Sequence, residues 1–160
     1  MTTDQAELVV SRAITVEAPQ ERAFDVFTEG MSRWWPLETH HIGSRQPNEA
    51  VLEPRPGGRW FERADDGSEC EWGRVLEWDA PSRIVLAWHL GPEWKYDPDP
   101  ARATEVEVRF IADGPTRTHV ELEHRGFEVL GDRADELRVP VAGEGGWSGL
   151  LELYAKAAAG

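Results

Sequence analysis

Six segments between residues 49 and 125 alternate apolar and polar side chains with a period of two, and turn residues interrupt the pattern at short intervals. Successive side chains of an extended strand point to opposite faces, so each segment predicts a strand with one buried face. The interruptions, which include PRPGG, DDG, DAPS and DGPT, are rich in residues that favour tight turns. We therefore expect an antiparallel meander. Its strands are predicted at residues 49–54, 58–64, 69–79, 82–90, 104–112 and 116–125.

The chain before the meander predicts one more strand and two short helices. Residues 8–17 alternate in the same way, which indicates a further half-buried strand. Residues 19–30 carry apolar side chains at helical spacing, and the proline at their start suits the first turn of a helix. A second short helical piece is expected from Met31 to Trp35, because Pro36 would end it.

The C-terminal end of the chain predicts a long amphipathic helix. Its apolar side chains fall at positions i, i+3, i+4 and i+7 from Trp147 to Tyr154. Before it, a helical turn is expected around residues 133–137, interrupted by Pro140. The apolar face of the long helix needs a partner, and the dry face of the sheet is the one large surface available. The predicted fold class is therefore α+β, with the sheet wrapped around this helix.

The composition is that of a soluble globular protein, with 40% hydrophobic and 29% charged residues. We expect one domain spanning residues 1–160. The net charge of -13 disfavours nucleic acid and anionic membranes, because both require concentrated positive charge. The chain has no basic, apolar start typical of a signal peptide and no apolar run long enough for membrane insertion. The single cysteine, Cys70, excludes an internal disulfide, so a cytoplasmic location fits best.

Eight tryptophans in 160 residues are the main anomaly of the sequence. Strand parity puts Trp60, Trp72 and Trp88 where they could face a cavity, and helical spacing turns Trp147 towards the sheet. A core position is the better explanation for any single tryptophan. The excess as a whole is better explained by a pocket, because indole rings provide flat, rigid apolar walls. We therefore expect at least two of them to line a binding site.

Trp34 and Trp35 are adjacent, and neighbouring residues of a helix point about 100° apart. Both therefore cannot be core residues on one helical face. One is expected to anchor the short helix, and the other to lie partly exposed at the cavity mouth as a lid or rim. The alternative is a surface tryptophan packed under its own loop. Trp35 is the candidate ligand contact of this pair.

Three polar residues are predicted to point inward and are candidate ligand contacts. Arg12 and Arg74 fall in the inner rows of their strands, where a buried arginine needs a carboxylate or an anionic ligand group. His124 lies in the inner row of an otherwise apolar strand. It is more readily explained as a core histidine whose hydrogen bonds are satisfied, and Arg12 or a ligand could supply its partner.

Other motifs give no catalytic or metal site. His40 and His41 are adjacent, but no matching spacing completes a set of three or four metal ligands. GWSGL resembles a nucleophile elbow, yet its fifth residue is Leu and no strand precedes it, so Ser148 is interpreted as a helix-start residue. Because no catalytic constellation is identified, we predict no cofactor and favour a protein that is not an enzyme.

The order of the predicted elements resembles the helix-grip fold of the START-like superfamily, also called SRPBCC. Within it, the chain resembles the group related to the activator of heat-shock protein 90 ATPase, in a single-domain form. Five stretches carry the resemblance, in the family's order, from Ile14 to Lys156. They are ITVEAPQERAFDVFTE with a nearby WW, PGGRWFE, WGRVLEWDAPSRIVLAWHL, THVELEHRGFE and GGWSGLLELYAKA.

The resemblance implies a curved antiparallel sheet of about seven strands, with two short helices after the first strand, wrapped around the long C-terminal helix. It also implies a cavity between sheet and helix that often holds an apolar or amphipathic ligand. It does not imply one chemistry, because relatives include lipid carriers, hormone receptors, polyketide cyclases, ring-oxygenase subunits and co-chaperone domains.

Three functions are compatible with these features. The first is binding of a small hydrophobic or amphipathic molecule between sheet and helix. The second is a cyclase-like or hydrolase-like enzyme that uses the same cavity, with His124 as acid or base. The third is a co-chaperone-like, stress-response interaction domain. A homodimer and a chaperone partner are both compatible with the chain, although no segment of it marks either.

Overall fold

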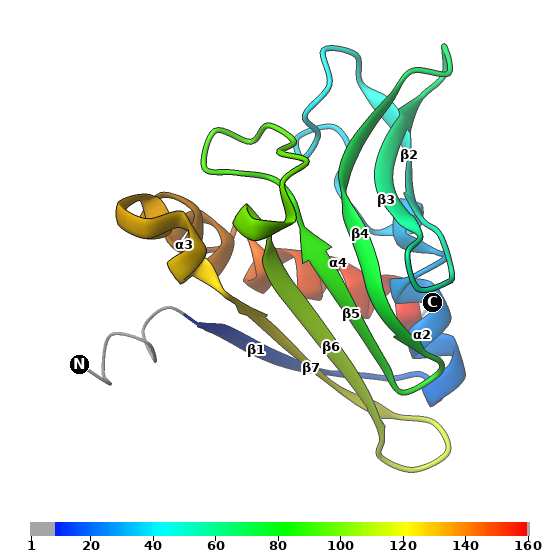
Figure 1. Cartoon of the computed structure of the whole chain (residues 1–160). Helices are drawn as coiled ribbons and strands as arrows, with labels where there is room; N and C mark the ends of the chain where they lie inside the picture. Colours follow the sequence, from blue (N-terminus) through cyan, green and yellow to red (C-terminus); the bar gives the residue numbers. More distant parts are fainter. Residues whose placement is uncertain (1–8, 160) are drawn as a thin grey trace, which may run out of the picture.

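The computed structural model describes residues 9–159 and contains a seven-stranded antiparallel sheet (Figure 1). Its strands follow the order β1-β7-β6-β5-β4-β3-β2. The strands are β1 (Val10–Val16), β2 (Pro47–Leu52), β3 (Arg59–Ala64), β4 (Glu69–Asp79), β5 (Arg83–Trp88), β6 (Thr104–Ala112) and β7 (Thr118–Arg125). The predicted meander is confirmed, because β2 to β7 pair consecutively and β1 closes against β7. Leu8, the expected first residue of β1, lies outside the described residues.

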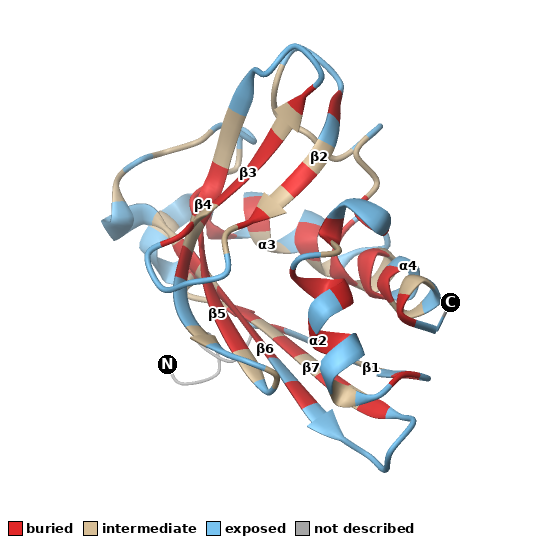
Figure 2. Cartoon of the chain, turned by 90° about the vertical axis from the view of Figure 1, so that its right-hand side faces the viewer, coloured by how far each residue is buried: buried red, intermediate tan, exposed pale blue. Residues whose placement is uncertain are grey.

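The helices of the described residues are α2 (Gln20–Phe27), η1 (Met31–Arg33), η2 (Pro100–Arg102), η3 (Phe127–Arg133), α3 (Ala134–Ala142) and α4 (Trp147–Ala159), where η marks 3-10 helices. Of these, α2 and α4 pack against the concave side of the sheet (Figure 2). Figure 2 shows the buried residues of α2 and α4 turned towards the sheet. The Tyr154 hydroxyl of α4 donates to the Ala23 carbonyl of α2 over 2.6 Å, which joins the two helices. The fold is therefore the α+β helix-grip arrangement that the sequence predicts.

The helix α3 continues through Pro140, where the sequence predicts an interruption. Proline removes one backbone donor and its ring crowds the preceding turn. Only two residues follow Pro140 before the helix ends at Ala142, so little of the helix depends on the missing hydrogen bond. The last carbonyl, that of Ala142, accepts a hydrogen bond from Arg12 over 2.6 Å. The charged donor satisfies a group that a helix end leaves without an intrahelical partner.

A bulge in β4 changes which side chains face the helices. Trp60 of β3 lies opposite Gly73, whereas the next residue, Phe61, lies opposite Glu71. Trp72 is therefore an extra residue in β4, and the strand's alternation is reversed beyond it. The bulge requires glycine at position 73, because a Cβ atom there would lie 1.8 Å from the Ala87 carbonyl oxygen.

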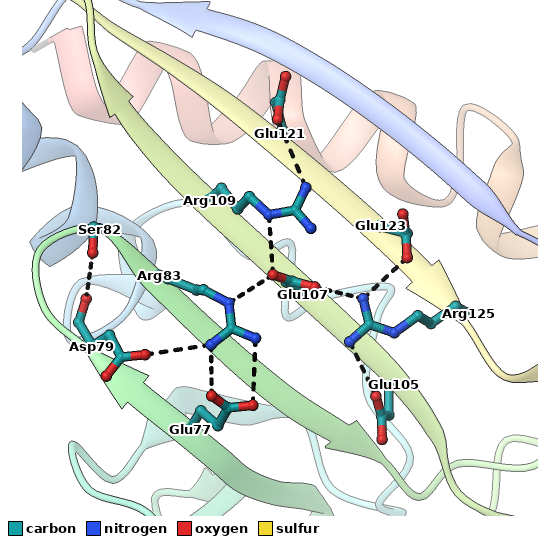
Figure 3. A network of polar contacts seen from close by, with 10 residues as sticks. All are labelled: Glu77, Asp79, Ser82, Arg83, Glu105, Glu107, Arg109, Glu121, Glu123 and Arg125. Carbon is teal, nitrogen blue, oxygen red and sulfur yellow. Dashed lines mark hydrogen bonds and ion pairs between the residues drawn. The ribbon is translucent and has the colours of Figure 1, made fainter.

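The convex face of the sheet carries a network of ion pairs centred on Glu107 (Figure 3). Its carboxylate lies 2.7 Å from Arg83, 3.0 Å from Arg109 and 2.6 Å from Arg125. Burial alone would raise the pKa of Glu107, but the hydrogen bonds from Arg83 and Arg125 outweigh it and lower the pKa to about 2. The network joins β5, β6 and β7 through side chains in addition to their backbone hydrogen bonds.

The helices of residues 9–159 include none that is both long enough and apolar enough to cross a bilayer.

Candidate functional site

A cavity of about 580 Å³ lies between the sheet and the start of α4. The sheet contributes Trp72 from β4 and Trp88 from β5, and α4 contributes Trp147. The remaining wall comes from the loop after η1, the loop between β5 and β6, and the end of α3 with its connection to α4. Trp35 belongs to the first of these segments and Trp94 to the second. Five indole rings therefore border one cavity.

The carboxylate of Glu62 fixes one wall of the cavity. It is 3% exposed and accepts a hydrogen bond from the Trp72 Nε1 over 2.8 Å. It also accepts from the backbone nitrogens of Ile42 and Gly43 at 2.7 and 3.1 Å. A buried carboxylate that receives several donors orients all of them. Glu62 thereby ties the Trp72 ring to the loop that forms the rim.

His124 lies behind Trp147 and supports the part of the cavity wall that Trp147 forms. It is fully buried and accepts a hydrogen bond at Nδ1 from the Trp147 Nε1 over 3.0 Å. Nε2 lies 2.8 Å from the Thr104 hydroxyl and carries the proton, since Nδ1 is the acceptor. Burial lowers the pKa of His124 to about 3, so the ring is neutral at physiological pH. It positions Trp147 and lies outside the cavity lining.

The indole nitrogen of Trp88 differs from those of its neighbours. Trp35, Trp72 and Trp147 each donate to a protein acceptor, which for Trp35 is the His40 carbonyl at 2.9 Å. Within residues 9–159, the Trp88 Nε1 is buried and has no hydrogen-bond partner. An unsatisfied buried donor costs about 1–3 kcal/mol, so such groups are rare in folded proteins.

Two features close the rim of the cavity. The His40 Nε2 donates to the Gly145 carbonyl over 2.6 Å, which joins the loop after η1 to the connection between α3 and α4. On the other side, Trp94 is 41% exposed and has a positive φ of 61°, an uncommon conformation for a bulky residue. Its ring centroid lies 6.5 Å from that of Trp88, so Trp94 extends the aromatic wall out to solvent.

Of the eight candidate ligand contacts, the structure brings four tryptophans to the cavity: Trp35, Trp72, Trp88 and Trp147. Trp60 instead packs behind them. It is fully buried, its ring lies 5.7 Å from those of Trp72 and Trp88, and its Nε1 donates to the Met31 sulfur.

The three polar candidates lie elsewhere. Arg12 donates to the Ala142 carbonyl and to the Ser148 hydroxyl at 2.9 Å, so it stabilises the turn between α3 and α4 where a carboxylate or ligand was expected. Arg74 lies on the convex face beside Ala87 and pairs with Glu71, because the bulge reverses the alternation of β4. His124 is a satisfied core histidine, with Thr104 and Trp147 as partners in place of Arg12.

The expectation that one of Trp34 and Trp35 is partly exposed is wrong, because both are buried. The two residues do not share one helix, because η1 ends at Arg33 and the chain turns there. Trp34 packs on Phe27 and donates to the Val26 carbonyl at 2.9 Å. The Trp35 ring lies beside that of Trp34, at 5.7 Å between centroids, and 5.1 Å from that of Trp72.

Sequence reasoning missed several residues of the site, including Glu62, Trp94 and the Gly145–Gly146 pair. Glu62 could have been found, because it shares the parity of the inward Trp60 within one short strand. Trp94 and the glycines lie in loops without periodicity, so the sequence pattern gives no orientation for them.

The curved antiparallel sheet with the long helix α4 packed on it defines a START-like, helix-grip protein. The family model described as "Activator of Hsp90 ATPase homolog 1-like protein" matches residues 17–155. The chain belongs to this family. A search of curated proteins found no significant match.

Solved structures give more specific similarities. The anthrahydroquino-gamma-pyrone synthase Txn09, complexed with a molecule denoted SUM, is 35% identical with a TM-score of 0.65, over 92% of this chain and 95% of Txn09. The self-sacrificing resistance protein CalC from Micromonospora echinospora is 29% identical with a TM-score of 0.66, over 94% and 93% of the two chains. Protein MLL2253 from Mesorhizobium loti is 21% identical with a TM-score of 0.62, over 92% and 94%, which supports the fold alone.

Proposed function

We propose that this protein binds a small hydrophobic or amphipathic molecule, with flat aromatic rings, in the cavity between its sheet and α4. The observation that carries the proposal is the cavity itself, about 580 Å³ in volume and bordered by five indole rings. Ligand pockets of proteins typically enclose about 300–1,000 Å³ and are lined mainly by apolar and aromatic side chains. The volume and the lining both fall within this description.

The cavity walls are organised before any ligand arrives. Hydrogen bonds to Glu62, His124 and the His40 carbonyl hold the rings of Trp72, Trp147 and Trp35. Rigid walls lower the entropy that binding would otherwise cost. They also favour planar ligands, because stacked or edge-on ring contacts stabilise a flat ring more than a flexible chain.

The two most similar solved structures discussed above agree with a small-molecule role. Txn09 is named as a synthase of a fused-ring pyrone and was solved with a bound molecule, and CalC is named as a resistance protein. A binding cavity for an aromatic compound would be a property common to this chain and Txn09. The similarity extends over more than nine-tenths of both chains in each comparison.

The test is to fill the cavity with protein atoms. Val141 borders the cavity, whereas Val139 on the same helix is 57% exposed. Val141→Trp should weaken the binding of a fluorescent aromatic probe at least about tenfold. The matched control Val139→Trp should leave it unchanged. Native mass spectrometry of the freshly purified wild type should also release a discrete hydrophobic compound.

Two results would contradict the proposal. The first is a wild-type protein that binds nothing across a panel of lipids and multi-ring aromatics. The second is Val141→Trp binding the probe as tightly as Val139→Trp. Thermal melts of both variants distinguish a filled cavity from a disrupted core, because a tryptophan forced into a packed core lowers the melting temperature and one that enters the cavity leaves it near the wild-type value.

A ring-closing enzyme is the second candidate, favoured by the 35% identity to the synthase Txn09. His124 is unsuited to the acid-base role, because both of its nitrogens are engaged and its pKa is about 3. His41 is better suited, since it borders the cavity and its Nδ1 donates to the Gly43 carbonyl over 3.0 Å. That hydrogen bond leaves Nε2 as the basic nitrogen of the neutral ring.

This second candidate makes a separate prediction. The compound released from the wild type, added back to the apo-protein, should change mass or spectrum over time. His41→Gln should stop the change while the dissociation constant of the compound stays the same. Turnover that persists at the wild-type rate in His41→Gln would remove His41 from the mechanism. A compound that is bound and returned unaltered would leave binding as the function.

A further inference from the structure

The unpartnered indole N–H of Trp88 belongs to the wall of the proposed binding cavity. Trp88 is 5% exposed, and its Nε1 has no acceptor among the described residues. The indole N–H can only donate, so it needs an oxygen or nitrogen lone pair. In a native structure, a single unsatisfied buried donor calls for a specific explanation, and a bound group that accepts its hydrogen bond is one such explanation.

The aromatic side chains around Trp88 offer no free acceptor. Its ring contacts those of Trp60, Trp94, Trp147 and His124, with centroids 5.1–6.5 Å away. Three of these are indoles, which carry donors and no acceptor. Both nitrogens of His124 are already engaged, with Trp147 and with Thr104. Trp88 borders the cavity, so an acceptor brought by a ligand reaches this covered N–H when the ring turns towards that side.

The other tryptophans of the wall provide an internal comparison. Trp35, Trp72 and Trp147 line the same cavity, and each donates its N–H to a protein group at 2.8–3.0 Å. Their hydrogen-bonding capacity is therefore used to hold the wall in place. Trp94, the fifth ring of the wall, is 41% exposed, so Trp88 is the buried wall tryptophan whose donor has no protein acceptor among the described residues. Its N–H is therefore the buried donor of the wall that is available to a polar atom of the ligand.

We propose that the cavity selects aromatic molecules that carry an accepting oxygen, of the ketone, quinone or phenolate type, and that the Trp88 N–H donates to this oxygen. The inference rests on the proposed function and deepens it, since it assigns the chemical class of the ligand and the residue that determines specificity. The surrounding indole rings hold the hydrocarbon skeleton, and the hydrogen bond to Trp88 fixes its orientation. A ligand without the oxygen leaves the buried donor unsatisfied and binds more weakly.

The experiment compares two probes, fluorene and fluorenone, which have the same three-ring skeleton and differ in a CH₂ and a C=O group. Equilibrium dialysis gives the dissociation constants of both for the wild type and for Trp88→Phe. We expect the ratio of the fluorene to the fluorenone constant to fall about fivefold or more in Trp88→Phe. The loss of ring area affects both probes, so it cancels in this comparison.

Trp72→Phe is the matched control, because it removes an N–H whose partner is Glu62. Trp72→Phe should weaken the binding of both probes equally and leave the ratio of their dissociation constants at the wild-type value. A ratio that is the same in the wild type and in Trp88→Phe would overturn the inference while the proposed function stands. If the wild type binds neither probe, the inference fails. The proposed function fails with it when the panel of lipids and multi-ring aromatics shows no binding either.

A measurement on the wild type alone covers the case in which Trp88→Phe does not fold. In a spectrum of ¹⁵N-labelled indole groups, fluorenone should shift one N–H resonance downfield, and fluorene should not. Identical spectra with the two bound probes would refute the hydrogen bond without any variant. A downfield shift with fluorenone alone would support it.

Discussion

The neutral, buried state of His124 predicts that acid destabilises this protein. Its pKa is about 3 in the folded chain and about 6.5 in an unfolded one. Between these values the unfolded state binds more protons than the folded state, so the free energy of unfolding falls as the pH falls. The contribution is complete above about pH 6.5 and is lost progressively towards pH 3.

The magnitude follows from the two pKa values. Between pH 8 and pH 5 the proton linkage of His124 removes about 2 kcal/mol from the free energy of unfolding. Glu107 does not account for this loss, because its pKa falls from 4.5 to about 2 and its linkage lies below that window. A loss of this size is a large part of the stability of a typical domain.

The assay is urea unfolding at pH 8, 7, 6 and 5 for the wild type and for His124→Asn. The asparagine can still accept from Trp147, and it does not titrate. The variant should be less stable at pH 8, yet it should lose about 2 kcal/mol less than the wild type on going to pH 5. Equal losses in the two proteins would refute the assignment of His124 as a neutral core residue. NMR titration of the His124 ring gives an independent value of its folded pKa.

Three further substitutions test the framework around the site by urea unfolding. Gly73→Ala should lower the free energy of unfolding by about 3 kcal/mol or more, because its Cβ would meet the Ala87 carbonyl. In the control Gly91→Ala the added Cβ meets no atom, so the free energy of unfolding should hardly change. Similar costs for the two would contradict the bulge. Glu107→Gln should cost about 1–3 kcal/mol by leaving three arginines without their shared carboxylate; no change would mean that the network adds no stability. Arg12→Gln should cost about 1–3 kcal/mol by freeing the end of α3, and an unchanged unfolding midpoint would contradict that role.

The periodic parts of the chain could be predicted from the sequence. The strands β4 and β6 have the expected bounds, residues 69–79 and 104–112, and the other strands of the meander differ from expectation by a few residues at their ends. The alternation of apolar and polar residues reflects burial directly, because one face of each strand is buried in the core. The C-terminal helix and its apolar face follow from spacing in the same way.

The errors arose where the backbone departs from a regular repeat. Arg74 was assigned to the inner face because the bulge at Trp72 leaves no mark in the alternation. Trp34 and Trp35 were assigned to one helix, although the chain turns after Arg33. Arg12 is predicted to meet a carboxylate or an anionic ligand group, but a carbonyl at the end of a helix attracts the same charge, and only the folded chain reveals it.

Several expectations remain predictions. A homodimer, a chaperone partner, a role in the stress response and a cytoplasmic location follow from composition or family resemblance. They depend on surfaces and partners that periodicity does not mark.

Contacts among the indole rings determine how the tryptophan fluorescence of this protein responds to a ligand. Seven tryptophans form a connected series of neighbouring rings. They are Trp34, Trp35, Trp60, Trp72, Trp88, Trp94 and Trp147. Rings this close pass excitation energy to one another before they emit, so the series behaves as one fluorophore. A quencher that touches any single ring will then dim the emission of all of them. The depth of quenching reports how full the cavity is, and it does not reveal which ring the ligand touches.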